Sequence, residues 1–210
     1  SRSFPMAAPE AMPACSGALA APVRGARIRR DMDPFAAVQD HEHVAIVHDR
    51  TARATAIVAV HDTRLGPAFG GIRRARYADL AAALRDVTAL ARAMTQKCAL
   101  ADLPAGGGKA VLLDHDQLDR NGGYRLLGRT VERLGGTFRT GPDVGTSEAD
   151  LRTVAAVTRH VAVPGIDGIG DLARATAFGV LASMTALAET LQRPVRGLRV
   201  AVQGTGAVGA

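Results

Sequence analysis

Two lysines are the residues in this sequence whose type and setting could do acid–base chemistry. Lys97 closes a predicted helix, and Lys109 follows three successive glycines at the start of a predicted strand. Glycines let a backbone approach a ligand closely, and a lysine beside them can be partly buried. Burial or a second lysine nearby lowers the pKa of an ammonium group, so Lys109 could act as a general base while Lys97 holds an anionic group. The ordinary alternative for either lysine is a solvated surface charge.

Asp143 is the third candidate, in the run GPDVGT at residues 141–146. It follows a predicted strand, and ligands bind at the carboxyl ends of strands in α/β sheets. Opposite the two lysines, its carboxylate could take part in proton transfer. A turn or a helix cap is an equally good role for an aspartate at this spacing, so both interpretations stand.

The glycines at the end of the sequence form a second candidate site. Gly204, Gly206 and Gly209 fit the pattern G-x-G-x-x-G and directly follow an apolar run at residues 198–203. A strand leading into such glycines is the setting of a dinucleotide-binding turn, where the backbone approaches a pyrophosphate closely. The alternative is an ordinary glycine-rich turn. The helix and the acidic residue of the full fingerprint would follow Ala210, so we interpret the sequence as a fragment.

Spacing excludes two other kinds of site. The Gly-Lys pair at residues 108–109 is not a nucleoside triphosphate loop, because Leu103 stands at the first glycine position and Ala110 replaces Ser or Thr. The two cysteines, Cys15 and Cys98, give neither a disulfide framework nor a zinc spacing, so we expect no metal site.

The charge of the chain raises the question of a nucleic-acid partner. The formal net charge is +6, which is compatible with such a partner. The arginines are scattered, however, and with 3% aromatic residues few side chains could stack on bases. No apolar stretch is long enough to span a membrane. We therefore expect a cytoplasmic protein without a nucleic-acid or membrane partner.

Strands and helices are predicted to alternate along the chain, which favours an α/β fold. With 47% hydrophobic residues and few aromatics, the core must be packed from Val, Leu, Ile and Ala. The first two predicted strands are expected to form a hairpin. We predict strands at residues 44–49, 55–61, 110–113, 137–140, 161–163 and 198–203, helices at 79–94, 124–134, 147–158 and 171–191, a loop at 65–71 and a joint at 165–170.

Composition divides the chain into three parts. Residues 1–30 are rich in Ala, Pro and Arg, and Glu10 is the only acid before Asp31, so we predict a disordered extension there. Residues 31–165 are expected to form a substrate-binding and catalytic domain. Residues 166–210 are expected to hold a linker helix and the start of an incomplete dinucleotide-binding domain.

Six motifs occur along residues 44–210 in the order found in one enzyme family. They are LGPAFGGIR (65–73), MTQK (94–97), LPAGGGK (103–109), GPDVGT (141–146), TAFGV (176–180) and VQGTGAVG (202–209). On these motifs the chain resembles the leucine/phenylalanine/valine dehydrogenase family, relatives of glutamate dehydrogenase. The resemblance implies a substrate-binding and dimerisation domain with a mixed sheet flanked by helices. A linker helix and the first strand of a truncated Rossmann domain would follow.

The resemblance also implies an activity. It is the oxidative deamination of an L-amino acid of the Leu, Val or Phe type to its 2-oxo acid and ammonia, with NAD or NADP. By this analogy Lys97 binds the substrate carboxylate. Lys109 acts as base toward the amino group or the attacking water, and Asp143 shuttles protons.

The same analogy assigns residues that bind rather than react. Gly70 and Gly71 would line the substrate cleft, and Met94 would border the side-chain pocket. Thr176 would contact the nicotinamide amide, and the pyrophosphate would lie against Gly204, Gly206 and Gly209.

The resemblance implies a homo-oligomer as well, either a dimer or an octamer. The alternative to an enzyme is a non-catalytic domain that binds an amino acid or serves in assembly. The glycines of the final fingerprint would have no purpose in such a domain.

Overall fold

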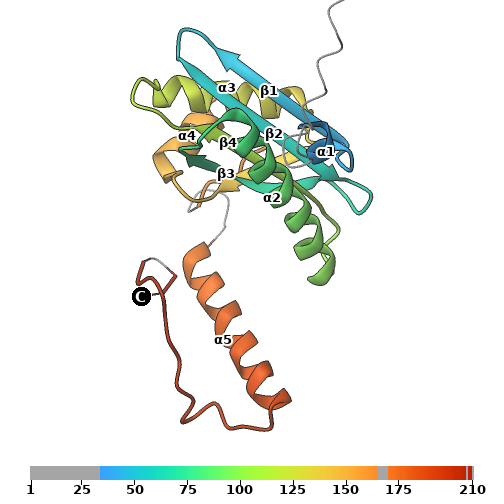
Figure 1. Ribbon diagram of the computed structural model, residues 1–210, viewed down its shortest axis with the longest axis vertical. Helices are drawn as coiled ribbons and strands as arrows, with labels where there is room; N and C mark the ends of the chain where they lie inside the picture. Colours follow the sequence, from blue (N-terminus) through green and yellow to red (C-terminus); the bar gives the residue numbers. More distant parts are fainter. Residues whose placement is uncertain (1–33, 165–169, 207, 210) are drawn as a thin grey trace, which may run out of the picture. The chain divides into compact units, whose positions relative to one another are not determined.

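The computed structural model describes residues 34–164, 170–206 and 208–209. The extension predicted at residues 1–30 and most of the joint predicted at 165–170 lie outside the described residues. Along the chain the elements are α1 (Pro34–Val38), β1 (His43–Asp49), β2 (Ala54–Asp62), β3 (Ala68–Ala75), α2 (Leu80–Leu100), β4 (Gly106–Leu113), α3 (Arg120–Arg133), β5 (Phe138–Pro142), α4 (Glu148–Ala155) and α5 (Leu172–Thr190) (Figure 1).

The strands of the described residues form one mixed sheet in the order β1-β2-β4-β3-β5. The strands β1 and β2 are the predicted hairpin, β2 is antiparallel to β4, and β3 is parallel to both β4 and β5. The connection from β3 to β4 runs across the sheet toward β1. The connection from β4 to β5 runs the opposite way and passes β3. Right-handed crossovers in opposite directions put α2 and α3 on opposite faces of the sheet (Figure 1). The predicted α/β fold with a mixed, helix-flanked sheet is confirmed.

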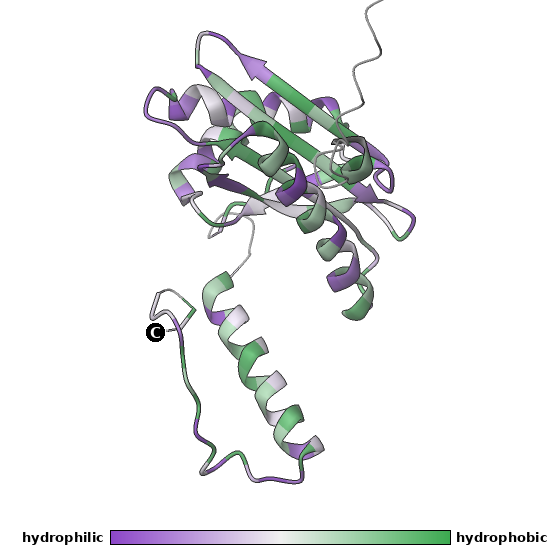
Figure 2. Cartoon of the chain, viewed as in Figure 1, coloured by the Kyte–Doolittle hydropathy of each residue, from purple (hydrophilic) through white to green (hydrophobic). Residues whose placement is uncertain are grey.

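Each face of the sheet has its own hydrophobic core, because neighbouring residues of a strand point to opposite faces. Val111 of β4 packs with Val87 of α2, whereas Leu112 packs with Leu127 of α3 and with Phe138 of β5. The central strands are therefore hydrophobic along much of their length (Figure 2). An odd-numbered residue of β4, such as Lys109, lies on the face that α2 covers.

Side chains that cap the helices set where they begin. Asp79 accepts a hydrogen bond from the backbone of Ala82 and starts α2, and Asp119 accepts one from Gly122 and starts α3. The predicted start of α3 at residue 124 was four residues late, because this cap holds two glycines in the first turn. The predicted end of α2 at residue 94 was six residues early, because no glycine or proline interrupts the helix before Leu100.

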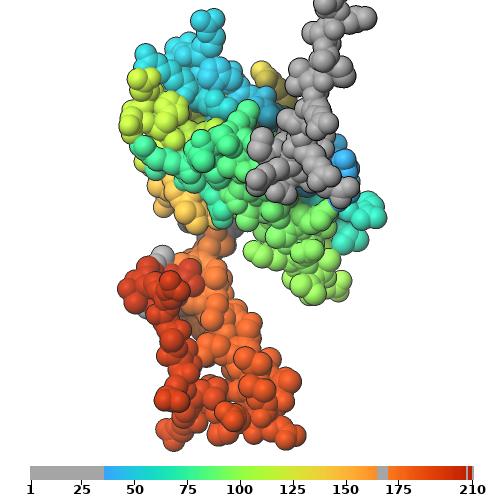
Figure 3. Space-filling view, in the orientation of Figure 1, coloured from blue at the N-terminus to red at the C-terminus, as the bar shows by residue number. Residues whose placement is uncertain are grey.

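The two long helices are α2, with 21 residues, and α5, with 19. The C-terminal end of α2 projects past the sheet (Figure 1), and the atoms of this segment form a green protrusion in the space-filling view (Figure 3). Leu100, the last residue of α2, is 89% exposed. No helix in the described part of the chain is long and apolar enough to cross a membrane.

The prediction of a loop across residues 65–71 is confirmed for residues 65–67 and was wrong for residues 68–71, which belong to β3. A Cβ atom on Gly70 would lie 1.7 Å from the carbonyl oxygen of Gly108, and one on Gly71 would lie 2.3 Å from that of Pro142. These glycines are present because strand backbones pass close together, and not because the chain turns.

Two predicted strands are absent from the described residues. Residues 161–163 contribute only an isolated bridge, between Val161 and Thr140. Residues 198–203 have no strand conformation at all. A strand needs a neighbour for its N–H and C=O groups, and the described part of the chain offers none to residues 198–203, so both predictions were wrong.

Candidate active site

The glycine run at the start of β4 lets helix α2 lie directly on the strand. A Cβ atom on Gly107 would stand 2.1 Å from the backbone nitrogen of Thr95 and 2.4 Å from the carbonyl oxygen of Ala91. Any side chain at this position would push the helix off the sheet. Lys97 and Lys109 each follow this contact by two residues, and the charge of Lys97 is near enough to act on Lys109.

Lys109 is a buried lysine with one carboxylate partner. Its side chain is 7% exposed, and its Nζ lies 2.8 Å from Oδ2 of Asp143. Burial lowers the pKa of Lys109, and the positive charges of Arg73 and Lys97 lower it further, while Asp143 opposes the shift. The net effect is a pKa below the ordinary value for lysine, which is what a general base requires.

Asp143 follows the last residue of β5 and is half-buried. Burial raises the pKa of this carboxyl, but the hydrogen bond and charge of Lys109, the N–H of Val144 and a hydrogen bond from Arg73 outweigh it. The pKa of Asp143 is therefore below its ordinary value, and the carboxylate stays ionised beside the lysine. The two groups can pass a proton to and from a reactant that lies beside them.

Sequence reasoning missed Arg73, which the structure places in this site. Its Nε donates to Oδ2 of Asp143 at 3.0 Å, and its Nη1 donates to Oδ2 of Asp86 on α2, also at 3.0 Å. The hydroxyl of Tyr77 donates to the same oxygen of Asp86 at 2.7 Å. Arg73 closes the motif at residues 65–73 and lies two residues after Gly71, on the same face of β3, so the motif itself held the signal.

The residues expected to bind substrate divide between two elements. Gly70 and Gly71 lie in β3, and a Cβ atom on Gly71 would be 2.9 Å from the Cβ of Asp143, so this glycine borders the carboxylate. Met94 is half-buried in α2 and Lys97 is exposed near the end of that helix. The structure thus brings Gly71, Asp143 and Lys109 together, with the charge of Lys97 in range.

The residues expected to hold a dinucleotide lie on α5 and beyond it. Thr176 is exposed, and its hydroxyl donates to the carbonyl oxygen of Leu172 at 2.7 Å. Gly204 has a φ of +91°, and a Cβ atom on Gly209 would lie 2.1 Å from the carbonyl oxygen of Gly204. Glycine is therefore needed at both positions of this turn.

These residues are not joined to the lysine site by any bond. In residues 34–164, 170–206 and 208–209, neither Thr176 nor the three glycines of the turn form a hydrogen bond or ion pair with Lys97, Lys109 or Asp143. The same residues contain no cluster of three His, Cys, Asp or Glu that could hold a metal ion.

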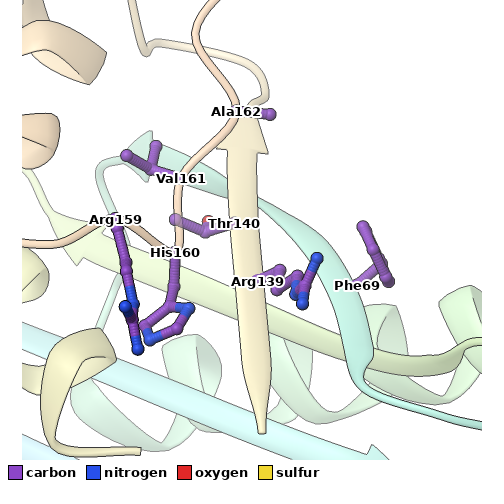
Figure 4. A pocket seen from close by; sticks show the side chains of 7 residues that line it. All are labelled: Phe69, Arg139, Thr140, Arg159, His160, Val161 and Ala162. Carbon is purple, nitrogen blue, oxygen red and sulfur yellow. The ribbon is translucent and has the colours of Figure 1, made fainter. Parts of the chain in front are cut away.

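A pocket of about 450 Å³ lies elsewhere, at the edge strand β5. Figure 4 shows that its side chains diverge: those of Arg139 and Phe69 point to one side of the strand, and those of Arg159 and His160 to the other. A ligand site needs a few polar groups that converge. The paired groups at Lys109 and Asp143 are therefore the better candidate.

Comparison with known proteins gives a consistent set of relatives. The family described as Glu/Leu/Phe/Val dehydrogenase, dimerisation domain, matches residues 37–160. The chain is 42% identical over 171 residues to the L-tryptophan dehydrogenase of Nostoc punctiforme (strain ATCC 29133 / PCC 73102), covering 80% of this chain and 48% of that protein. It is 38% identical over 187 residues to the phenylalanine dehydrogenase of Bacillus thermotolerans, covering 87% and 49%.

The fold is similar as well. The crystal structure of L-tryptophan dehydrogenase from Nostoc punctiforme matches with a TM-score of 0.67 and 40% identity, over 83% of this chain and 51% of that one. The chain spans about half the length of the curated relatives it matches.

Proposed function

The chain belongs to the Glu/Leu/Phe/Val dehydrogenase family, and from this premise we propose that the protein containing it oxidatively deaminates an L-amino acid to its 2-oxo acid and ammonia. The observation that carries the proposal is the ion pair between buried Lys109 and half-buried Asp143, 2.8 Å apart. Relatives named for tryptophan and phenylalanine support a substrate with an apolar side chain, which extends the Leu, Val and Phe types expected from the motifs.

The use of lysine in this chain supports the same proposal. The sequence has 26 lysines and arginines, of which only Lys97 and Lys109 are lysines. Arginine suits surface charge equally well but cannot lose its proton in a protein, whereas lysine can. The chain thus keeps a lysine at position 109, where the proposed reaction needs an ammonium group that can deprotonate.

In the proposed reaction each residue handles one part of the substrate. Lys97 holds the carboxylate as an ion pair. Neutral Lys109 removes a proton from the substrate ammonium group, so that the α-carbon can give up its hydride. Lys109 releases that proton to solvent and then, neutral again, removes a proton from the water that attacks the resulting iminium carbon. Asp143 carries the hydroxyl proton of the carbinolamine to its nitrogen, which leaves as ammonia as the carbonyl forms.

A nicotinamide dinucleotide, NAD or NADP, would accept the two electrons when bound. The turn at Gly204–Gly209 has the close backbone packing that a pyrophosphate-binding turn needs, because a side chain on Gly209 would collide with the carbonyl oxygen of Gly204. Thr176 would meet the nicotinamide amide.

We propose a division of the chain to match. Residues 31–165 form the substrate-binding domain, and residues 166–210 hold the linker helix and the first part of the dinucleotide-binding domain. The description of the matched family as a dimerisation domain supports a homo-oligomer, and we propose a cytoplasmic one.

The test is a pair of lysine exchanges in the protein that contains this chain. Lys109→Arg keeps the charge but removes the ability to deprotonate, so kcat should fall at least about a thousandfold. Lys97→Arg keeps the charge that the substrate carboxylate needs, so kcat should fall much less and KM should rise. Steady-state kinetics with several L-amino acids measure both effects, and circular dichroism checks that both variants are folded.

An equal fall of kcat in Lys109→Arg and Lys97→Arg would contradict the separate roles proposed for the two lysines. Normal turnover by Lys109→Arg would remove Lys109 as the base. If the unaltered protein turns over no amino acid but still binds one, the non-catalytic alternative is correct.

A further inference from the structure

The carboxylate of Asp143 has two cations on one oxygen. Oδ2 lies 2.8 Å from Nζ of Lys109 and 3.0 Å from Nε of Arg73. The other end of the guanidinium is also anchored, since Nη1 of Arg73 lies 3.0 Å from Oδ2 of Asp86 and 3.3 Å from its Oδ1. Because Tyr77 donates to Asp86 in turn, the contacts form a continuous chain from Tyr77 to Lys109.

Arg73 and Lys109 differ in what they can do with a proton. Burial opposes the charge of Arg73, but Asp143 and Asp86 outweigh it and keep the pKa of Arg73 above its ordinary value. Arg73 therefore stays charged when Lys109 becomes neutral. Without it, loss of the proton from Lys109 would leave the half-buried carboxylate of Asp143 without a cation, which is costly in the interior of a protein.

We infer that Arg73 is a positioning residue: its guanidinium holds Asp143 against Lys109 and remains the counter-ion of that carboxylate when Lys109 gives up its proton. Asp86 and Tyr77 keep the guanidinium in place. The inference rests on the proposed function, because it assumes that Lys109 must become neutral in order to react.

The charged groups that face Lys109 come from several elements. Arg73 lies on β3, Asp143 follows β5, and Lys97 and Asp86 lie on α2. On the remaining side, β2 places Ala59 opposite Lys109, and the titratable side chain nearest to that register position is His61. Of these groups, Arg73 and Lys97 disfavour the protonated form of Lys109, and Asp143 favours it.

Arg73→Gln removes a positive charge and leaves Asp143 with Lys109 as its partner, so protonated Lys109 becomes more stable and its pKa rises. The neutral form then appears only at higher pH. The acidic limb of the kcat/KM profile should move toward alkaline pH, with at least about a tenfold loss of kcat/KM at a pH below the limb.

The matched control is Arg74, the next residue of β3. Its side chain is 21% exposed, against 25% for Arg73, and it pairs with Asp114 at 2.6 Å, so it is an ion-paired arginine of similar burial. Arg74→Gln should leave the acidic limb in place. An unmoved limb in Arg73→Gln, or an equal displacement in both variants, would overturn the inference.

A second measurement can be made on this chain by itself, in which Lys97 and Lys109 are the two lysines. With ε-¹⁵N-lysine, NMR follows the side chain of Lys109 directly as pH changes, and Lys97→Arg assigns the two signals. The pKa of Lys109 should rise in Arg73→Gln. Arg73→Lys retains a positive charge that reaches only one of the two carboxylates. In this variant the pKa of Lys109 should lie between its values in the unaltered chain and in Arg73→Gln.

These spectra need no turnover, so they test the role of Arg73 separately from the proposed function. A raised pKa in an inactive protein supports the role of Arg73 and contradicts the proposed function. An unchanged pKa in folded Arg73→Gln and Arg73→Lys contradicts the role of Arg73 whatever the activity.

Discussion

Asp150 is a buried carboxylate with a structural role, and its hydrogen-bond partners differ in kind from those of Asp143. The side chain of Asp150 is 5% exposed and accepts from Nη2 of Arg120 at 2.5 Å. It also accepts from the backbone and the hydroxyl of Ser147, at 2.7 and 2.6 Å, as part of the capping box of α4. All its strong partners are fixed donors, so it locks α4 to α3, whereas Asp143 shares its oxygen with a lysine that can lose a proton.

The role of Asp150 predicts how stability depends on pH. Burial raises the pKa of Asp150, but Arg120 and Ser147 outweigh it and the pKa falls below the ordinary 3.8. A depressed folded-state pKa gives stability that is present above the unfolded value and is lost as pH falls through the folded value. Asp150→Asn should therefore cost about 2 kcal/mol of unfolding free energy near pH 7, a figure kept low because the side chain of Arg120 is 45% exposed.

Urea unfolding at two pH values checks this. The difference between Asp150→Asn and the unaltered chain should shrink as pH falls below 3.8. Glu148→Gln is the control, because its pair with Arg152 is more than half exposed at both ends and should contribute less than about 0.5 kcal/mol. A difference that does not depend on pH would assign the loss to packing.

At the scale of elements, the contact between α2 and β4 decides the geometry of the candidate site. The helix lies so close that the Cα of Gly107 faces the backbone at Thr95 and Ala91 with no room for a methyl group. Gly107→Ala should therefore destabilise the fold by about 3 kcal/mol, because the atoms to be displaced are backbone atoms of a helix.

Gly141→Ala is the control for that substitution. Gly141 lies in the same sheet, but its added Cβ would meet nothing nearer than 3.7 Å, so the cost should stay within about 1 kcal/mol. Thermal and urea unfolding of both variants measure the difference. Similar losses would mean that glycine is needed in these strands for its backbone and not for the close approach of α2.

The success of the sequence predictions also differs from element to element. Hydrophobic periodicity and capping residues located β1, β2, α5 and the start of α4 to within about one residue, since these signals are local, whereas the predicted end of α4 was three residues late. The glycines of β3 were misread as a turn because their reason is a neighbouring strand that is distant in sequence. Arg73 was missed as a site residue for the same cause, as its partners Asp86 and Asp143 come from other elements.

On the scale of the whole molecule, the two cores lie within one continuous stretch of the described chain. The residues of both cores, and the side chains packed against them, all fall between Val38 and Val163. Every strand of the sheet falls in the same stretch. The hydrophobic burial that drives folding is therefore supplied before α5 begins.

This arrangement predicts that residues 31–165 fold without the rest of the chain. The fragment keeps the complete sheet and both cores, so it should unfold in one cooperative transition and retain the ion pair between Lys109 and Asp143. A shorter fragment, residues 31–136, loses β5 and α4 and with them Phe138, Leu151 and Val154 of the larger core. It should not fold, because the strand that borders β3 and the carboxylate partner of Lys109 are both missing. Circular dichroism and urea unfolding of the two fragments distinguish the cases, and a 31–165 fragment without a cooperative transition would show that residues beyond the proposed boundary contribute to the core.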